Sequence, residues 1–178
     1  MTKSKTRAGK RSHGDPALRV QLKPSTSENG YTTPKTGYVD GAWWPQGDEL
    51  VTELPALLAV LAARIGPVHH VAYPLGEWAG TPADLVVAGR TVRCAGYRYG
   101  AAHTVEMLGV KDCRLVLLVV PPHTDAHDAF ATMTSASATN DESTVDELLM
   151  IGVRERSDRA DRAAVQRWVS EGGAEHRS

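Results

Sequence analysis

The sequence predicts an α+β domain: an antiparallel, strongly twisted sheet of about six strands packed with one or two main helices, with flexible termini. Three observations lead to this prediction. Several short segments alternate apolar and polar residues, one longer segment has the period of an amphipathic helix, and proline or glycine ends most of them. With 178 residues, 42% of them hydrophobic, the chain can bury one ordinary core.

The expected organisation is a single domain between two tails. Residues 1–16 are rich in Lys, Arg, Ser, Thr and Gly, so we expect a disordered basic arm. Residues 17–137 form the α+β domain. Residues 138–178 begin with a polar, acidic stretch, which predicts an acidic linker followed by a variable C-terminal helical tail.

The strands are predicted from alternation or from short apolar runs closed by turn residues. They lie at 18–22, 38–44, 68–73, 85–87, 91–94, 103–108 and 114–120. Ala88-Gly89 predicts a tight hairpin between two of them, and a second hairpin joins the last two. The run Leu115 to Val120 lacks polar alternation, which indicates a central strand that is covered on both faces.

Two adjacent tryptophans, Trp43 and Trp44, fall inside the strand predicted at 38–44. Successive side chains of a strand point to opposite faces. One indole therefore enters the main core, while its neighbour must be covered by a further element or remain as an aromatic surface.

The first helix is predicted from six apolar residues on one stripe: Leu50, Leu54, Leu57, Leu58, Leu61 and Ile65. Because a proline inside a helix loses a backbone hydrogen bond, Pro55 predicts a preliminary turn at 48–53 and the helix proper from about residue 54. A second helix is expected at about 125–137. Thr144 and Glu147 match a capping box before a short helix, and a separate helix at 157–171 is expected to dock weakly or stay partly free.

The chain resembles a small, uncharacterised actinobacterial protein family, a domain of unknown function. The resemblance rests on the segments 18–24, 37–45 (GYVDGAWWP), 53–58, 71–73, 103–105 and 117–122, and it covers residues 17–137. It implies a compact domain of a cytoplasmic protein, and it supplies no catalytic residues.

The composition also bears on the compartment. No apolar run is long enough for a secretory signal or a membrane span, so we expect a cytoplasmic protein without membrane contact. Cys94 and Cys113 have no metal-binding or redox spacing, and free thiols are expected.

The leading functional hypothesis is a non-enzymatic interaction or regulatory module with an unknown protein partner. Exposed aromatic side chains are typical of partner sites, and the candidates are Trp44, Trp78, Tyr97 and Tyr99. This assignment applies if these residues are exposed, and it fails if all four are buried.

A second hypothesis is a nucleic-acid-associated protein. Residues 1–16 carry five basic groups against Asp15, a net charge of +4, whereas the whole chain has a net charge of −1. The arm would therefore supply the contacts with phosphate, which would be weak and dependent on salt concentration. Its basic residues are Lys3, Lys5, Arg7, Lys10 and Arg11.

A third hypothesis is a small-ligand-binding protein or an enzyme with a histidine and carboxylate site. The candidates are Asp40, His69, His70, His103 and Glu106. A histidine beside a carboxylate can act as a general base, although no nucleophile motif accompanies these residues, so a structural or surface role is the favoured interpretation.

No cofactor or metal site is predicted. His123 and His127 have a spacing that would place them on one helix face, but a zinc site needs a third protein ligand. A polar first turn of a helix is the favoured interpretation.

Overall fold

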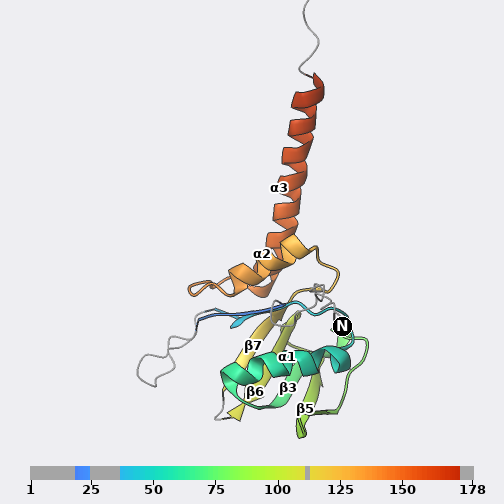
Figure 1. The fold of residues 1–178 in the computed structure, drawn as a ribbon, viewed down its shortest axis with the longest axis vertical. Helices are drawn as coiled ribbons and strands as arrows, with labels where there is room; N and C mark the ends of the chain where they lie inside the picture. The colour runs from blue at the N-terminus through green and yellow to red at the C-terminus, as the bar shows by residue number, and fades with distance from the viewer. Residues whose placement is uncertain (1–18, 25–36, 111–112, 173–178) are drawn as a thin grey trace, which may run out of the picture.

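The structure is a computed structural model that describes residues 19–24, 37–110 and 113–172 (Figure 1). Its elements follow one another as β1 (Val20–Leu22), β2 (Gly41–Trp43), α1 (Leu50–Ile65), β3 (Val68–Pro74), the 3₁₀ helix η2 (Leu75–Glu77), β4 (Asp84–Val87), β5 (Arg90–Tyr97), β6 (Thr104–Gly109), β7 (Arg114–Val119), α2 (Ala126–Ala136) and α3 (Val145–Gly172). The α+β prediction is confirmed.

Over the described residues the strands form one seven-stranded sheet in the order β1-β2-β7-β6-β3-β5-β4. The sheet is mixed, because β2 pairs with β7 and β3 pairs with β5 in parallel, whereas the remaining neighbours are antiparallel. The sequence prediction of a purely antiparallel sheet missed these two pairings. Hairpins leave local turn signals, but a pairing between strands that are distant in sequence leaves none.

Both predicted hairpins are confirmed. Strands β4 and β5 are joined at Ala88 and Gly89, whose φ angles of 49° and 75° are the positive values that a two-residue hairpin turn requires. Strands β6 and β7 form the second hairpin, in which Leu108 pairs with Arg114.

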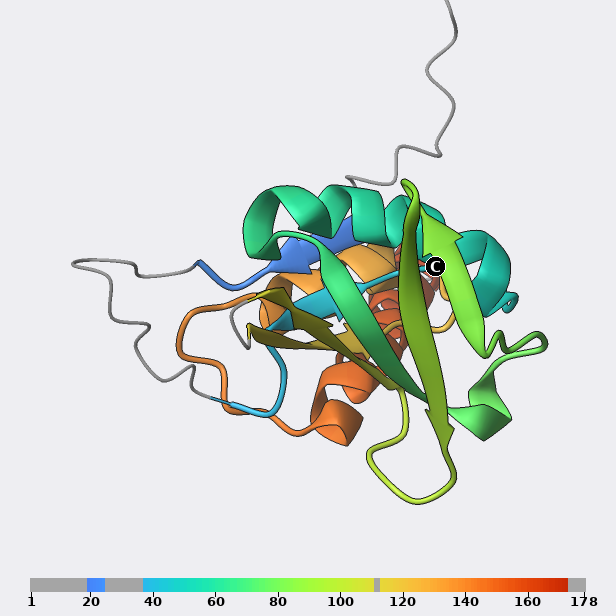
Figure 2. The same cartoon turned by 90° about the horizontal axis from the view of Figure 1, so that it is seen from below.

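Helix α1 covers one face of the sheet, and all six residues of its predicted stripe are buried (Figure 2). It begins at Leu50, four residues earlier than predicted, and contains Pro55. A residue with an N–H at position 55 would donate a hydrogen bond to the carbonyl of Val51, but proline has no N–H. Val51 and Pro55 are both exposed. Water can therefore replace the lost bond, and the proline does not end the helix.

The core under α1 includes side chains from every strand of the described sheet. A smaller second core lies on the opposite face, where α2 and the start of α3 cover β2 and β7. Strand β7 contributes to both, with Leu117 in the first core and Leu118 in the second. The prediction of a central strand covered on both faces is confirmed.

The tryptophan pair behaves as its strand periodicity predicts. Trp43 lies in the first core and stacks on Trp78, with ring centroids 5.6 Å apart. Trp44 lies in the second core. Its ring makes a T-shaped contact with the ring of Phe130 from α2, with centroids 6.0 Å apart. The guanidinium carbon of Arg19 lies 4.2 Å from the Trp44 ring centroid.

Helix α3 is one continuous helix of 28 residues rather than the two helices that were predicted. Its capping box is confirmed, because the Thr144 N–H donates to Glu147 Oε2 at 2.7 Å and the Glu147 N–H donates to Thr144 Oγ1 at 3.3 Å. Leu148 packs into the second core, so the start of α3 contacts the same core as α2 and β7. The remaining turns project away from the sheet (Figure 1).

Cys94 and Cys113 are free thiols, as predicted. Burial raises the pKa of the Cys94 thiol, with a smaller contribution from the charge of Asp84, so this cysteine is less reactive than an exposed one. Among the helices of the described segments, none combines the length and apolar character needed to cross a membrane.

Candidate functional site

The four aromatic residues predicted to bind a partner do not form one exposed cluster. Trp44 and Trp78 are buried, and they belong to cores on opposite faces of the sheet. The expectation of exposure is therefore wrong for these two, because α2 covers the first and the connection after η2 folds the second onto Trp43. Tyr97 is half-buried and its hydroxyl lies 3.1 Å from Thr104 Oγ1, whereas Tyr99 is exposed. A partner-binding role for these residues remains a prediction.

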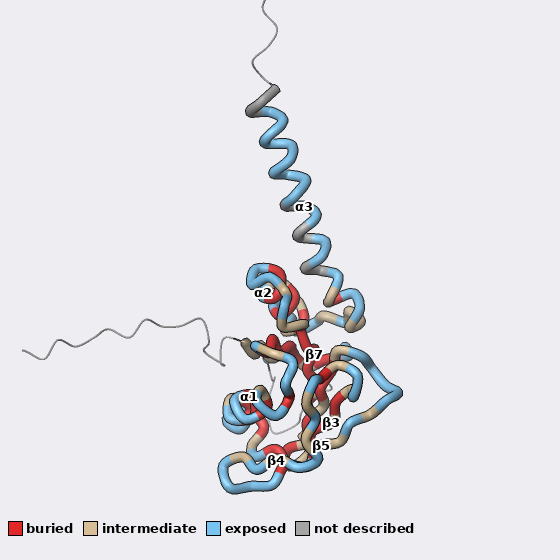
Figure 3. Tube along the Cα trace, turned by 90° about the vertical axis from the view of Figure 1, so that its right-hand side faces the viewer, coloured by how far each residue is buried: buried red, intermediate tan, exposed pale blue. Residues whose placement is uncertain are grey.

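The most exposed of the large apolar side chains described on α3 lie on its distal half. Val165, Trp168 and Val169 are 61%, 77% and 61% exposed. Their spacing of three and four residues places them on one side of the helix. Figure 3 shows that the projecting part of α3 is exposed almost throughout. This is an apolar stripe without a covering element among the described residues, and it is called the α3 stripe below.

No described element covers about half of the sheet face opposite α1. Here Asp84 of β4, Arg93 of β5, His70 of β3 and Leu108 of β6 stand directly opposite one another in register. Residues that pair across strands share a face, so these side chains form one row. They line an open hollow of about 490 Å³ together with His69, which lies where a register shift interrupts the pairing of β3 with β6.

Two predicted carboxylates lie on this same face, but each already has a structural role. Glu106 receives two bonds from the guanidinium of Arg114, at 2.6 and 2.8 Å. These bonds hold the pKa of Glu106 below its ordinary value, with smaller contributions from the charges of Arg114 and His70. Asp40 accepts the Val116 N–H at 2.8 Å and thereby extends the pairing of β2 with β7. The topology thus brings Asp40, His70 and Glu106 to one face, with both carboxylates engaged.

His103 does not join them. It lies just before β6, at the opposite end of that strand from Leu108, and its N–H donates to Glu77 Oε1 at 2.7 Å. Its Nδ1 lies 3.9 Å from Glu77 Oε2. His103 therefore lies apart from the other residues of the predicted histidine and carboxylate site, and the carboxylate beside it is Glu77.

Glu77 is a residue that sequence reasoning missed. It lies in the connection between β3 and β4, where turn residues leave no periodic pattern. A second hollow of about 180 Å³ lies here, between Glu77, Trp78 and His103 and the chain that follows β7.

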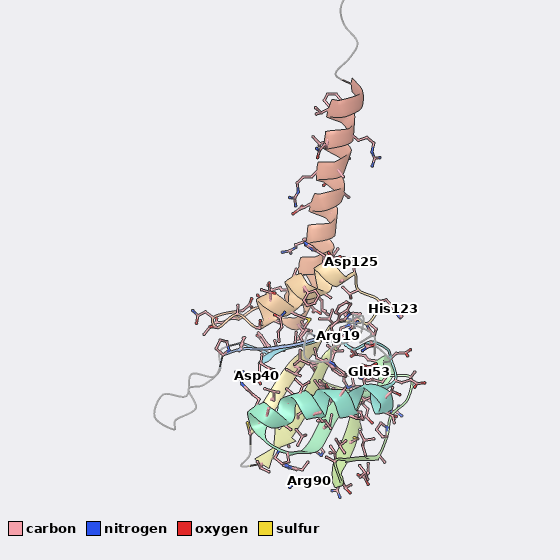
Figure 4. The ribbon with its side chains drawn as sticks, in the orientation of Figure 1. Arg19, Asp40, Glu53, Arg90, His123 and Asp125 are labelled. Atoms are coloured by element: carbon pink, nitrogen blue, oxygen red, sulfur yellow. The ribbon has the colours of Figure 1, made fainter. Side chains whose placement is uncertain are left out.

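No group of three or more His, Cys, Asp and Glu residues within the described segments is placed to hold a metal ion. His123 and Asp125 lie at the start of α2 (Figure 4), where Asp125 is the N-cap and accepts the His127 N–H at 3.0 Å. The interpretation of this segment as a polar first turn is confirmed. The five basic residues of the N-terminal arm lie outside the described residues, so nucleic-acid binding remains a prediction.

Comparisons with known proteins give one result. No curated protein matches the chain, and no solved structure matches it either. The sequence profile of a family of unknown function, DUF5994, matches residues 19–136. This range runs from Arg19 to the last residue of α2 and nearly coincides with the range of the resemblance, although the actinobacterial origin remains a prediction. The chain therefore belongs to the family of unknown function DUF5994.

Proposed function

We propose that the protein is a non-enzymatic cytoplasmic interaction module that binds a partner protein through the α3 stripe. The observation that carries this proposal is the exposure of Val165, Trp168 and Val169 together on one side of a projecting helix. Burial of one large apolar side chain lowers the free energy by about 1.5–3 kcal/mol. Three such side chains exposed side by side are therefore typical of a surface that binds a partner.

The geometry fits a familiar mode of recognition. A helix that places residues i, i+3 and i+4 into an apolar groove of a partner buries them as a unit. Because α3 projects from the domain, the groove of a partner can reach the stripe without contacting the sheet (Figure 1). Tryptophan is enriched among the residues that dominate binding energy, so Trp168 is the expected anchor.

Catalysis at the predicted histidine and carboxylate site has less support. A general base needs a free carboxylate or imidazole within hydrogen-bonding reach of its substrate. Both oxygens of Glu106 bind Arg114, and Asp40 binds the backbone of β7. These two carboxylates stabilise the sheet and are not available as general bases. We therefore propose a binding role rather than catalysis.

The test compares three baits in a lysate of the source organism: the full chain, Trp168→Ala and the control Gln166→Ala. Gln166 is also exposed, but it lies on a different side of α3. The full chain and the control should retain the same partner. Loss of an anchor of this kind costs about 2 kcal/mol or more, so Trp168→Ala should weaken the Kd roughly 30-fold. Equal retention by all three baits would contradict the proposal.

A fourth bait that begins at Ala17 separates this proposal from the alternative based on the basic arm. The stripe predicts unchanged retention of the partner after the arm is removed. If the truncated bait loses the partner, and if binding by the full chain falls steeply with salt, the contact lies in the arm instead.

A further inference from the structure

Strand β3 contains an irregularity that places two neighbouring histidines on the same side of the sheet. Val68 and Val71 are both buried in the core under α1, although residues three apart in a regular strand point to opposite faces. The pairing of β3 with β6 shifts its register between Val68 and His70, which indicates a β-bulge. His69 and His70 therefore both line the hollow on the face opposite α1.

Strands β4 and β5 add further polar side chains to this hollow. Thr91 and Arg93 alternate with Val92, which is buried in the core under α1, so both point to the opposite face. Asp84 of β4 pairs with Arg93 in register and lies beside it. The volume of the hollow, about 490 Å³, falls within the range of about 300–1,000 Å³ that is typical of small-molecule sites.

The fold leaves the charged groups of the hollow without partners among the described residues. Asp84 stands directly opposite Arg93, yet the two side chains form no ion pair, and neither makes a hydrogen bond to another described residue. Both are exposed, as are Thr91 and His69. Paired strands hold these side chains in fixed positions, while their polar groups remain accessible to a ligand.

The chemistry of these side chains favours a phosphate. The guanidinium of Arg93 presents N–H donors in a fixed fork that fits two oxygens of a phosphate. The imidazoles of His69 and His70 each offer an N–H donor, in the neutral as well as in the charged form, and the Thr91 hydroxyl can donate too. Strands β3 and β5 are neighbours in the sheet, so these donors can reach one anionic group together.

The same hollow favours a small ester over a nucleic acid. Binding to a chain of phosphodiesters draws on several Lys or Arg contacts, whereas the described residues that line the hollow include Arg93 and no lysine. The carboxylate of Asp84 would repel a second phosphate, but it can accept hydrogen bonds from hydroxyl groups. The lining therefore fits a single phosphate that is attached to a hydroxylated carbon skeleton.

We propose that this hollow binds a small phosphate monoester that also carries hydroxyl groups, the class of the sugar phosphates. Arg93, His69 and His70 hold the phosphate. Asp84 accepts hydrogen bonds from the hydroxyl groups. Of the residues in the histidine and carboxylate hypothesis, the two adjacent histidines belong to this site. The site is separate from the α3 stripe and does not depend on the proposed function.

The test is a titration of the full chain with ribose 5-phosphate and with glucose 6-phosphate at constant pH and ionic strength. The imidazole resonances of His69 and His70, followed by NMR, should shift saturably with at least one of the two esters. Glucose, which lacks the phosphate, should give no saturable shift, and inorganic phosphate should bind at least tenfold more weakly than the ester.

Three results would overturn the proposal. Neither ester shifts the imidazole resonances, or inorganic phosphate binds as tightly as both esters, or a single-stranded oligonucleotide binds at this face more tightly than either ester. The last result would assign the face to a nucleic acid.

Variants locate the site. Arg93→Gln removes the charge of an exposed side chain, so the affinity for the ester should fall at least tenfold. Arg90→Gln is the matched control, because Arg90 is an exposed arginine of the same strand that lines a different hollow beside α1 (Figure 4). This control should bind the ester as the original chain does. Asp84→Ala should reduce the preference for the ester over inorganic phosphate.

The variants can also contradict the assignment. If Arg93→Gln gives a folded spectrum and binds the ester as tightly as the original chain, Arg93 does not hold the phosphate. An equal loss of affinity in Arg90→Gln would show an unspecific effect of net charge, and the site would not be the hollow beside His70.

Discussion

The two faces of the sheet are covered to different extents. Helix α1 lies on one face, and the core beneath it takes side chains from every strand of the described sheet. On the other face, the cover that the described elements provide comes from α2 and the first turns of α3 and extends over the half that contains β2 and β7. The remaining half exposes a polar row that includes Asp84 and Arg93.

The difference shows how the sequence divides its residues between stability and surface. Positions under a helix are apolar and close-packed, so a substitution that changes the side-chain volume there lowers the stability of the whole domain. Positions on the open half contact water, so their identity matters little to folding. The predictions below test this division, beginning with the largest effect.

The strongest test uses two neighbouring residues of β7 that point to opposite faces. Leu117 and Leu118 are both 0% exposed, one in each core. Leu117→Ala and Leu118→Ala should each lower the free energy of unfolding by about 2–5 kcal/mol, because both leave cavities in packed cores. Urea denaturation measures both losses.

Val86→Ala on the open half serves as the control. Val86 is 69% exposed, so its replacement should change the free energy of unfolding by no more than about 0.5 kcal/mol. A small loss for Leu118→Ala, similar to that of Val86→Ala, would mean that α2 and α3 do not cover the second face.

The second prediction concerns the margin of the covered half, where Asp40 accepts the Val116 N–H. Asp40→Ala leaves this partly buried donor without its acceptor and should cost about 1–3 kcal/mol. Asp40→Asn keeps a side-chain oxygen in the same place and should cost less. Equal losses in the two variants, measured by thermal or urea unfolding, would show that this hydrogen bond does not hold the start of β2 against β7.

The covered parts of the fold were the most predictable from sequence. The leucine stripe of α1, the tryptophan pair and the unbroken apolar run of β7 each carry a period that reports burial directly. Pro55 misplaced the start of α1 because the helix accommodates this proline near its N-terminus, where water can reach the Val51 carbonyl that loses its donor. The two parallel pairings were missed because they depend on which distant strands meet.

The candidate sites were less predictable for a related reason. The exposure of an aromatic residue depends on the elements that fold over it, and nothing within residues 74–82 indicates that Trp78 stacks on Trp43. Glu77 has no periodic neighbours, and its importance comes from His103, which is distant in sequence. By contrast, the spacing of Val165, Trp168 and Val169 is a local feature of the sequence, whereas their exposure and the projection of α3 required the structure.

A third and smaller effect is expected at the start of α3, whose first turns complete the cover of the second face. Thr144→Ala removes the side chain that accepts the Glu147 N–H, and loss of such a cap costs about 1 kcal/mol. Thr144→Ser keeps the hydroxyl and should cost much less. Urea unfolding distinguishes the two variants, and an equal loss would mean that the capping box does not support the packing of Leu148.

The smallest effect is expected at the border between the two halves, at the ion pair between Glu106 of β6 and Arg114 of β7. The bonds from Arg114 lower the pKa of Glu106 in the folded protein, so the pair stabilises the fold at pH values above the pKa of the unfolded chain. This contribution is lost as the pH falls through the lowered pKa. Because 62% of the Arg114 side chain is exposed, Glu106→Gln should cost less than about 1 kcal/mol at neutral pH.

The pH dependence of this loss separates charge from packing. Glutamine has nearly the shape of glutamate, so the difference in unfolding free energy between Glu106→Gln and the original chain should vanish once the pH is below the lowered pKa. High salt at neutral pH should reduce it as well, since exposed charges are screened. A difference of several kcal/mol that persists at low pH would place Glu106 in a packed environment, and the open half would then resemble the covered one.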